Sequence, residues 1–356
     1  MFVNLKKIII FFVVSIISVG LVFVFTTTDE TFEALSGLNF SFLIILSVLW
    51  AATLFIEALS LKSFVCGTGE SLGLWLALKF IALKNFFNII TPMNSGGTPF
   101  LIFALSKEGI SPGKASSAVL MKVISKAAIS FIGVVIIIFF FRRYITDISY
   151  IKSLFFIMSI LFILLTGLAL FAMLSPRFLI TIITGLTNIL HKLKVIKITH
   201  NFKKKVIHEA YYARKSFRQY FRSHFFYFLA GNIWVFIYHL LQIVVLYIIL
   251  FGLGIHLPVL KGIVLSTLQQ AFIAFQPTPG GAGFGEGIFV LLFKGTVPVY
   301  LLGIAIILWR LFTQYLTAIF GAVLSGSYIQ VNSLRKPVYQ IKPKDKYTNK
   351  LDEEKL

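Results

Sequence analysis

Asn88-Ile-Ile-Thr-Pro-Met-Asn-Ser-Gly-Gly-Thr-Pro99 interrupts an apolar stretch that runs from residue 71 to residue 106. A second interruption, Pro277-Thr-Pro-Gly-Gly-Ala-Gly283, divides the apolar stretch from 259 to 294. Proline and glycine at this density end a helix, because proline lacks an amide proton and glycine is conformationally free. Each stretch is therefore predicted to form two short helices joined by a turn, which we call an interrupted hairpin.

The composition around these hairpins is that of an integral membrane protein. Of 356 residues, 58% are hydrophobic and only 13% are charged, whereas soluble domains are about 25% charged. A membrane-spanning helix needs about 20 apolar residues. The fold class predicted is an all-α polytopic membrane protein with six spans and the two interrupted hairpins, forming one membrane domain over 1–330 and a charged tail over 331–356. The six spans are expected at about 8–25, 41–62, 115–141, 153–174, 225–251 and 299–329.

The basic residues predict the orientation. The segment 175–224 holds eleven Lys and Arg against one acid, Glu209, and such loops stay in the cytoplasm. Both termini are then expected to be cytoplasmic, in a protein of the cytoplasmic membrane. This orientation requires that both interrupted hairpins are re-entrant and enter from opposite sides. The alternative is that the interruptions are ordinary loops between complete spans.

Opposite entry predicts an inverted repeat of 1–174 and 225–330, joined by the basic linker 175–224. In each half an interrupted hairpin precedes a span with a buried base. The two spacings nearly match, with 30 residues from Pro92 to Lys122 and 31 from Pro279 to Arg310. Inverted repeats with broken helices at the midplane are a recurring plan of transporters.

The turn motifs, together with Leu105-Ser-Lys-Glu-Gly-Ile110 and Glu286, resemble the flippase-like integral membrane family that includes the transmembrane region of lysylphosphatidylglycerol synthases. The resemblance implies a membrane domain that moves a lipid with a charged or phosphate head group between leaflets. It does not imply synthase activity, because the bifunctional members carry a soluble acyltransferase-like domain after the membrane region, where a charged tail is expected here. The chain is therefore expected not to be an enzyme.

Three buried bases are candidate ligands of a lipid phosphate. Lys122 and Lys126 lie one helical turn apart and share a face, and Arg310 lies near the middle of the last span. A base within the bilayer is a functional hypothesis by default, because its insertion is costly. The alternatives are snorkelling of the lysines to the interface, and pairing of Arg310 with Glu57 or Glu286 or capping of broken-helix carbonyls.

The two turns are predicted to add positive potential, because helices that restart after them would point free N–H groups at the midplane. The alternative is a helix break that merely lines a cavity. The turn residues concerned are Thr91, Pro92, Gly96 and Gly97 in the first hairpin and Thr278, Pro279, Gly280, Gly281 and Gly283 in the second.

Three further polar residues have proposed roles. Glu286, in the first turn of a restarting helix, is a candidate proton-coupling group, or else a simple dipole partner. Asn85 and Asn88 form a polar stripe that would line a hydrated cavity, or else make interhelical hydrogen bonds.

Partners follow from the same features. We expect a membrane lipid as substrate and anionic lipids along the basic segment 175–224. No metal site is expected, since the six histidines lack ligand spacing. No cofactor and no nucleic acid are expected either, and homo-oligomer formation is left open. The leading function is translocation of an anionic phospholipid or polyprenyl-phosphate carrier. The alternatives are the membrane part of a lipid-modifying transferase system, a phosphatidylglycerol lysyltransferase by name only, and a non-transporting partner of an envelope enzyme.

Overall fold

The computed structural model describes residues 40–91, 94–144, 160, 164, 213, 215–273 and 276–333, and over these residues it is helical with connecting turns. The predicted spans at 8–25 and 153–174 lie outside the described residues, apart from two isolated helical positions. The same holds for most of the basic linker and for the tail beyond residue 333.

The other four predicted spans are present as long apolar helices. They are α3 (Phe40–Cys66), α6 (Pro112–Phe140), α10 (Phe225–Gly252), and a run of α13 (Val299–Arg310), η4 (Leu311–Tyr315) and α14 (Leu316–Ser333). Each contains a window long and apolar enough to cross a bilayer. The start of α6 has a local cause, because Ser111 Oγ accepts the amide of Lys114 at 3.3 Å and Pro112 occupies the first turn.

The last span differs from its prediction in one respect. The helix does not continue in regular α geometry but passes through a π-helical turn, η4, directly after Arg310. Such turns widen the backbone locally and often occur at functional sites.

Both interrupted hairpins are present as pairs of short helices. The first consists of α4 (Leu74–Ile89) and α5 (Gly97–Lys107); the second consists of α11 (Val259–Ile273) and α12 (Phe284–Phe293), with the short η3 (Pro279–Gly281) between them. Helix α4 ends shortly before Pro92, as expected when a proline disfavours helical geometry in the residue before it.

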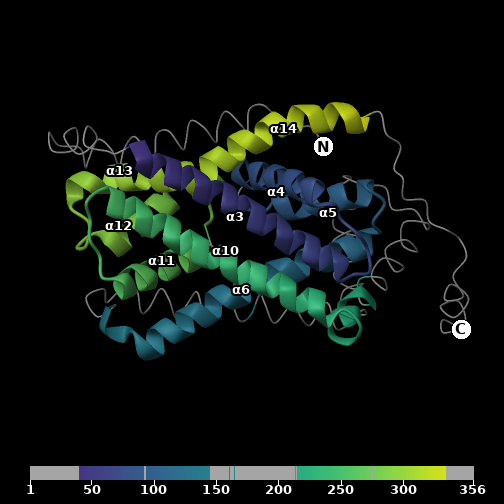
Figure 1. The fold of residues 1–356 in the computed structure, drawn as a ribbon, viewed down its shortest axis with the longest axis horizontal. Helices are drawn as coiled ribbons and strands as arrows, with labels where there is room; N and C mark the ends of the chain where they lie inside the picture. Colours follow the sequence, from purple (N-terminus) through teal and green to yellow (C-terminus); the bar gives the residue numbers. More distant parts are fainter. Residues whose placement is uncertain are drawn as a thin grey trace, which may run out of the picture.

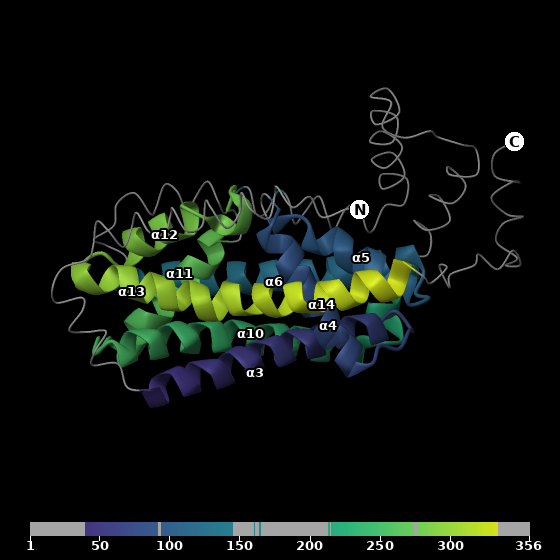
Figure 2. The ribbon, with the colours of Figure 1, turned by 90° about the horizontal axis from the view of Figure 1, so that it is seen from above.

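The order of elements repeats. A long helix of 27 residues (α3) or 28 residues (α10) is followed by a helix of 16 or 15 residues, one of 11 or 10 residues, and then another long helical run. In Figure 1, α3 and α10 lie side by side and run in opposite directions along the long axis. The first hairpin lies at one end of this axis and the second at the other, in both ribbon views (Figures 1 and 2). The described helices therefore follow the same order twice, and the long helices that begin the two series run in opposite directions.

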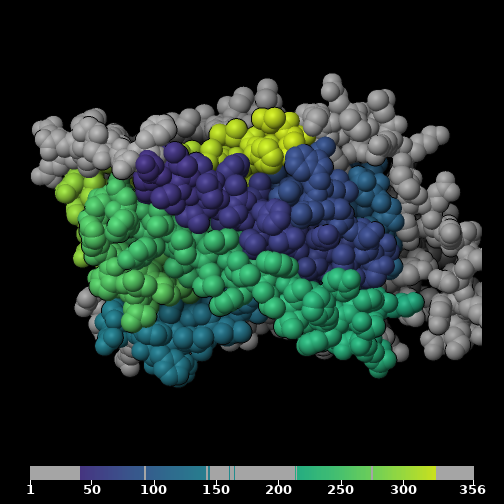
Figure 3. Space-filling view, viewed as in Figure 1, coloured from purple at the N-terminus to yellow at the C-terminus, as the bar shows by residue number. Residues whose placement is uncertain are grey.

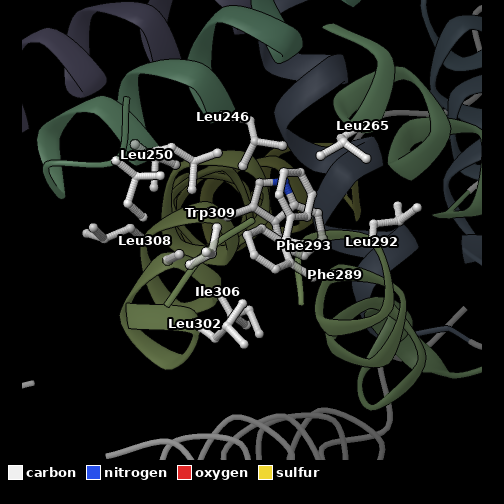
Figure 4. Close-up of a cluster of buried hydrophobic side chains, with 14 of the residues drawn as sticks. Leu246, Leu250, Leu265, Phe289, Leu292, Phe293, Leu302, Ile306, Leu308 and Trp309 are labelled. Carbon is white, nitrogen blue, oxygen red and sulfur yellow. The ribbon is translucent and has the colours of Figure 1, made fainter. Parts of the chain in front are cut away.

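The two main apolar clusters lie around the two hairpins, and each includes residues of both halves, such as Phe42 and Val134 in the cluster of the second hairpin and Val235 in that of the first. One cluster surrounds the first hairpin and the C-terminal half of α3, and the other surrounds the second hairpin. In the second cluster Phe289 stacks on Phe293 at 4.6 Å between ring centroids and lies 5.7 Å from Trp309; Figure 4 shows these rings among surrounding leucines. Close packing of this kind associates helices in lipid, where the hydrophobic effect contributes little.

The surface is apolar as well. Phe139, Phe226 and Val323 are each more than 70% exposed, and in Figure 3 the helices α3 and α10 form one continuous face. Large apolar side chains exposed on several helices are costly in water. The exposed face of the described helices is therefore suited to contact lipid.

Candidate functional site

Lys122 and Lys126 lie on α6, one turn apart, as the spacing predicts. Only 6% of Lys122 is exposed, so the snorkelling alternative does not describe this side chain. Its Nζ atom instead donates to the carboxylate of Glu57 on α3 at 3.2 Å and lies 3.4 Å from the backbone oxygen of the same residue.

Glu57 is the centre of a buried charged group. Lys84 of α4 donates to its Oε1 atom at 2.5 Å, the same oxygen that Lys122 contacts, and Asn85 donates to Oε2 at 3.2 Å. Three helices therefore converge on one carboxylate. We call Glu57, Lys84, Lys122 and Lys126 the Glu57 cluster.

Lys126 completes this cluster without a carboxylate of its own. Its Nζ atom lies 4.5 Å from the centroid of the Tyr238 ring on α10, a cation–π contact. No acid within the described ranges forms a salt bridge with Lys126, although its charge interacts with that of Glu57. One carboxylate and three ammonium groups leave a formal surplus of two positive charges inside the membrane helices.

A polar network borders the cluster on the α10 side. His239, 8% exposed, lies 2.6 Å from Gln270 Oε1 through Nδ1 and 3.4 Å from Ser130 Oγ through Nε2. These contacts join α6, α10 and α11. The sequence pattern pointed to none of them, because the three residues are far apart in the chain.

Arg310 is held very differently. Its guanidinium donates to the backbone oxygens of Gly280 and Gly281, each at 2.7 Å, and to Glu286 at 2.8 Å and Gln314 at 2.5 Å. Both Arg310 and Glu286 are 1% exposed. We call this arrangement the Arg310 clamp. It combines two of the alternatives considered for Arg310, pairing with Glu286 and capping of broken-helix carbonyls.

Lipid-phosphate binding by Lys122, Lys126 and Arg310 stays a prediction, and the structure distinguishes their surroundings. The Glu57 cluster has surplus positive charge, whereas the Arg310 clamp pairs one base with one acid. Proton coupling at Glu286 also stays a prediction. Its Oε2 atom contacts Arg310, while its Oε1 atom is buried and has no hydrogen-bond partner among the residues that the structure describes.

The turn of the first hairpin caps its own helix. Asn88 Oδ1 accepts the amide of Gly97 and Thr91 Oγ1 accepts that of Gly96, each at 2.8 Å. A Cβ atom on Gly97 would lie 2.2 Å from Asn88 Oδ1, so only glycine permits this approach. The side chains of this chain thus occupy two of the N–H groups expected to attract an anion. Pro92 lies outside the described residues.

The turn of the second hairpin uses its glycines for backbone conformation. Gly280, Gly281 and Gly283 have φ values of 57°, 71° and 81°, a region that residues with a Cβ atom rarely adopt. Thr278 and Pro279 lead into the turn, and their carbonyls accept the amides of Gly281 and Ala282. This conformation turns the carbonyls of Gly280 and Gly281 toward Arg310.

Asn85 and Asn88 have separate partners, Glu57 and Gly97, and cavity lining by these residues stays a prediction. Within the described part of the chain, no group of three His, Cys, Asp or Glu residues is placed to hold a metal ion.

Comparison with known proteins gives one match. No curated protein and no solved structure matches the chain. A protein family described as the lysylphosphatidylglycerol synthase TM region matches residues 8–321, which is most of the chain and includes both hairpins and both buried charged groups. The chain is therefore a multi-pass membrane protein that belongs to the lysylphosphatidylglycerol synthase transmembrane-region family.

Proposed function

We propose that this protein moves an anionic lipid, either a phospholipid or a polyprenyl-phosphate carrier, across the cytoplasmic membrane. The observation that carries the proposal is the surplus of two positive charges in the Glu57 cluster. Buried bases without equal counter-charge are expensive in a bilayer, and an anionic head group would supply the missing charge. Family membership supports a role in lipid modification or transport.

The arrangement of the helices is consistent with transport. In the proposed orientation the first hairpin is re-entrant from the cytoplasmic side and the second from the outside, both termini are cytoplasmic, and segment 175–224 contacts anionic lipid. The placement of the hairpins at opposite ends of the long axis supports entry from opposite sides (Figures 1 and 2). A head group at the Glu57 cluster would then lie between helices of both halves, since α10 contacts α3 and α6 there.

The first experiment measures lipid translocation in proteoliposomes that contain the purified full chain. Fluorescently labelled phosphatidylglycerol and phosphatidylcholine are compared by accessibility of the label to an external quencher. We expect faster exchange of phosphatidylglycerol, and a loss of about tenfold or more in Lys126→Gln, because a charge-assisted hydrogen bond contributes about 1.5–3 kcal/mol.

The matched control is Lys294→Gln, which removes one positive charge from an exposed position directly after α12. This variant should exchange phosphatidylglycerol at the wild-type rate. Equal rates for the two lipids in the wild type, or equal losses in Lys126→Gln and Lys294→Gln, would contradict the proposal.

The family description favours one alternative, a part in lipid modification. Mass spectrometry of lipids from cells with and without the chain separates the two functions. A change in head-group chemistry supports modification, whereas unchanged lipids with an altered distribution between leaflets support translocation. We propose that the chain itself carries no transferase chemistry.

A further inference from the structure

The carboxylate of Glu57 lies among the buried bases that the proposed function assigns to a lipid phosphate. Its two oxygens accept from three side chains, Lys84, Lys122 and Asn85, and only 4% of the residue is exposed. A phosphodiester likewise has one negative charge shared by two free oxygens. Bases that bind a carboxylate in this way are suited to bind such a phosphate by the same charge-assisted hydrogen bonds.

We propose that Glu57 is an internal competitor, which occupies the anion site until a lipid phosphate displaces it from Lys122. This inference rests on the proposed function, because it needs an anionic lipid to reach the cluster. It makes Glu57 a residue that lowers affinity for the lipid. Competition from the Glu57 carboxylate thereby sets how strongly a head group must bind to enter the anion site, and how readily the head group leaves that site.

The distances indicate which base is released. Lys84 contacts Glu57 Oε1 at 2.5 Å, whereas Lys122 contacts it at 3.2 Å. Glu57 therefore stays with Lys84, and Lys122 turns to the lipid. Lys126 is one turn away on the same face of α6 and already lacks a carboxylate partner among the described residues. The pair Lys122 and Lys126 would then hold the phosphate.

The charge balance explains why the exchange is favourable. With Glu57 alone, three bases share one acid; a bound phosphate provides a second negative charge. No base loses its counter-charge during the exchange, since Lys84 keeps Glu57 while Lys122 and Lys126 gain the phosphate. By contrast, an anion entering the Arg310 clamp would have to displace Glu286 from a one-to-one pair with no surplus charge.

The test compares the wild type with the double variant Glu57→Gln/Lys84→Gln. This variant loses one acid and one base, so the net charge of the cluster is unchanged while the competitor is absent. Binding of phosphatidylglycerol to the purified full chain is measured by native mass spectrometry, with phosphatidylcholine as the neutral reference. We expect binding about tenfold tighter than in the wild type, since the head group no longer competes for a charged hydrogen bond.

A matched control removes an ion pair elsewhere. Glu70 and Lys114 form a pair at 2.5 Å with side chains 33% and 24% exposed, and Glu70→Gln/Lys114→Gln should bind phosphatidylglycerol as the wild type does. If the first double variant does not fold, Glu57→Asp provides the same test, because the shorter side chain holds Lys122 less closely. Its affinity should also rise, and unchanged or weaker binding in the folded variant would overturn the inference.

Failure of the inference is distinguishable from failure of the proposed function. A wild type that retains phosphatidylglycerol no better than phosphatidylcholine contradicts the function itself. A wild type that prefers phosphatidylglycerol, combined with variants at Glu57 that bind no more tightly, contradicts only the competitor role. In that case Glu57 would be a structural ion-pair partner.

Discussion

Arg310 and Lys122 are buried bases on long helices in corresponding positions of the two halves, yet their surroundings differ. Arg310 donates four hydrogen bonds to its own chain and pairs with Glu286. Lys122 shares one carboxylate with Lys84, and Lys126, one turn away, has no salt bridge within the described ranges. At the scale of the residue, the described part of the first half has a formal surplus of positive charge in the Glu57 cluster, whereas the Arg310 clamp of the second half pairs one base with one acid.

Replacement of Arg310 by Gln should therefore destabilise the protein. The change leaves Glu286 without its cation and two buried carbonyls without donors; breaking a buried pair on one side costs about 3–5 kcal/mol. Thermal unfolding of the purified chain in detergent should show a clear decrease in midpoint. Arg310→Lys should recover only part of the loss, since one ammonium group cannot reproduce the guanidinium fork. Unchanged stability with lost retention of phosphatidylglycerol would instead support phosphate binding by Arg310.

At the scale of the element, the first hairpin is a helix break stabilised by its own side chains. Asn88 and Thr91 lie at and just beyond the end of α4 and cap the amides that begin α5. The break therefore leaves fewer free N–H groups than the turn motif alone suggests. Positive potential in this region comes mainly from the lysines.

Asn88→Ala should loosen the start of α5. Loss of an N-terminal cap costs about 0.5–2 kcal/mol, so amide hydrogen exchange at Gly97 should accelerate by a factor consistent with that energy. Asn88→Asp keeps an acceptor oxygen at the same position and should retain most of the protection. Equal exchange in the wild type and Asn88→Ala would show that the hydrogen bond to Gly97 does not hold the turn.

At the scale of the whole molecule, the two hairpins lie at opposite ends of the long axis (Figure 1). The first hairpin follows α3 after a short loop, and the second hairpin follows α10 in the same way. If α3 and α10 cross the bilayer in opposite directions, each hairpin starts on the side of the membrane where the preceding long helix ends. We therefore expect the turn after α5 and the loop after α10 to lie on opposite sides of the membrane.

Cysteine labelling tests this topology. Glu108 follows α5 and His256 follows α10, and both are exposed; each is replaced by Cys after the native Cys66 is changed to Ser. A membrane-impermeant thiol reagent added outside intact cells should label the cysteine at 256 and not that at 108, until the membrane is opened. Labelling of both from one face would contradict the inverted arrangement.

The sequence by itself determined the elements, and only the tertiary structure decided the partners. Apolar run length and the Pro and Gly turns predicted six spans and two interrupted hairpins, because these are local properties of the chain. Four of these spans and both helix pairs are present among the described residues. The same local reasoning could not distinguish Glu57 from Glu286 as the ion-pair partner of Arg310. Tertiary packing determined the partner, because it places Glu286 against Arg310. It also places Glu57 where three helices meet, in contact with Lys122, which is 65 residues away in the sequence. The π-helical turn after Arg310 had no sequence signal either. Such contacts depend on how distant helices pack, which no pattern within a single helix encodes.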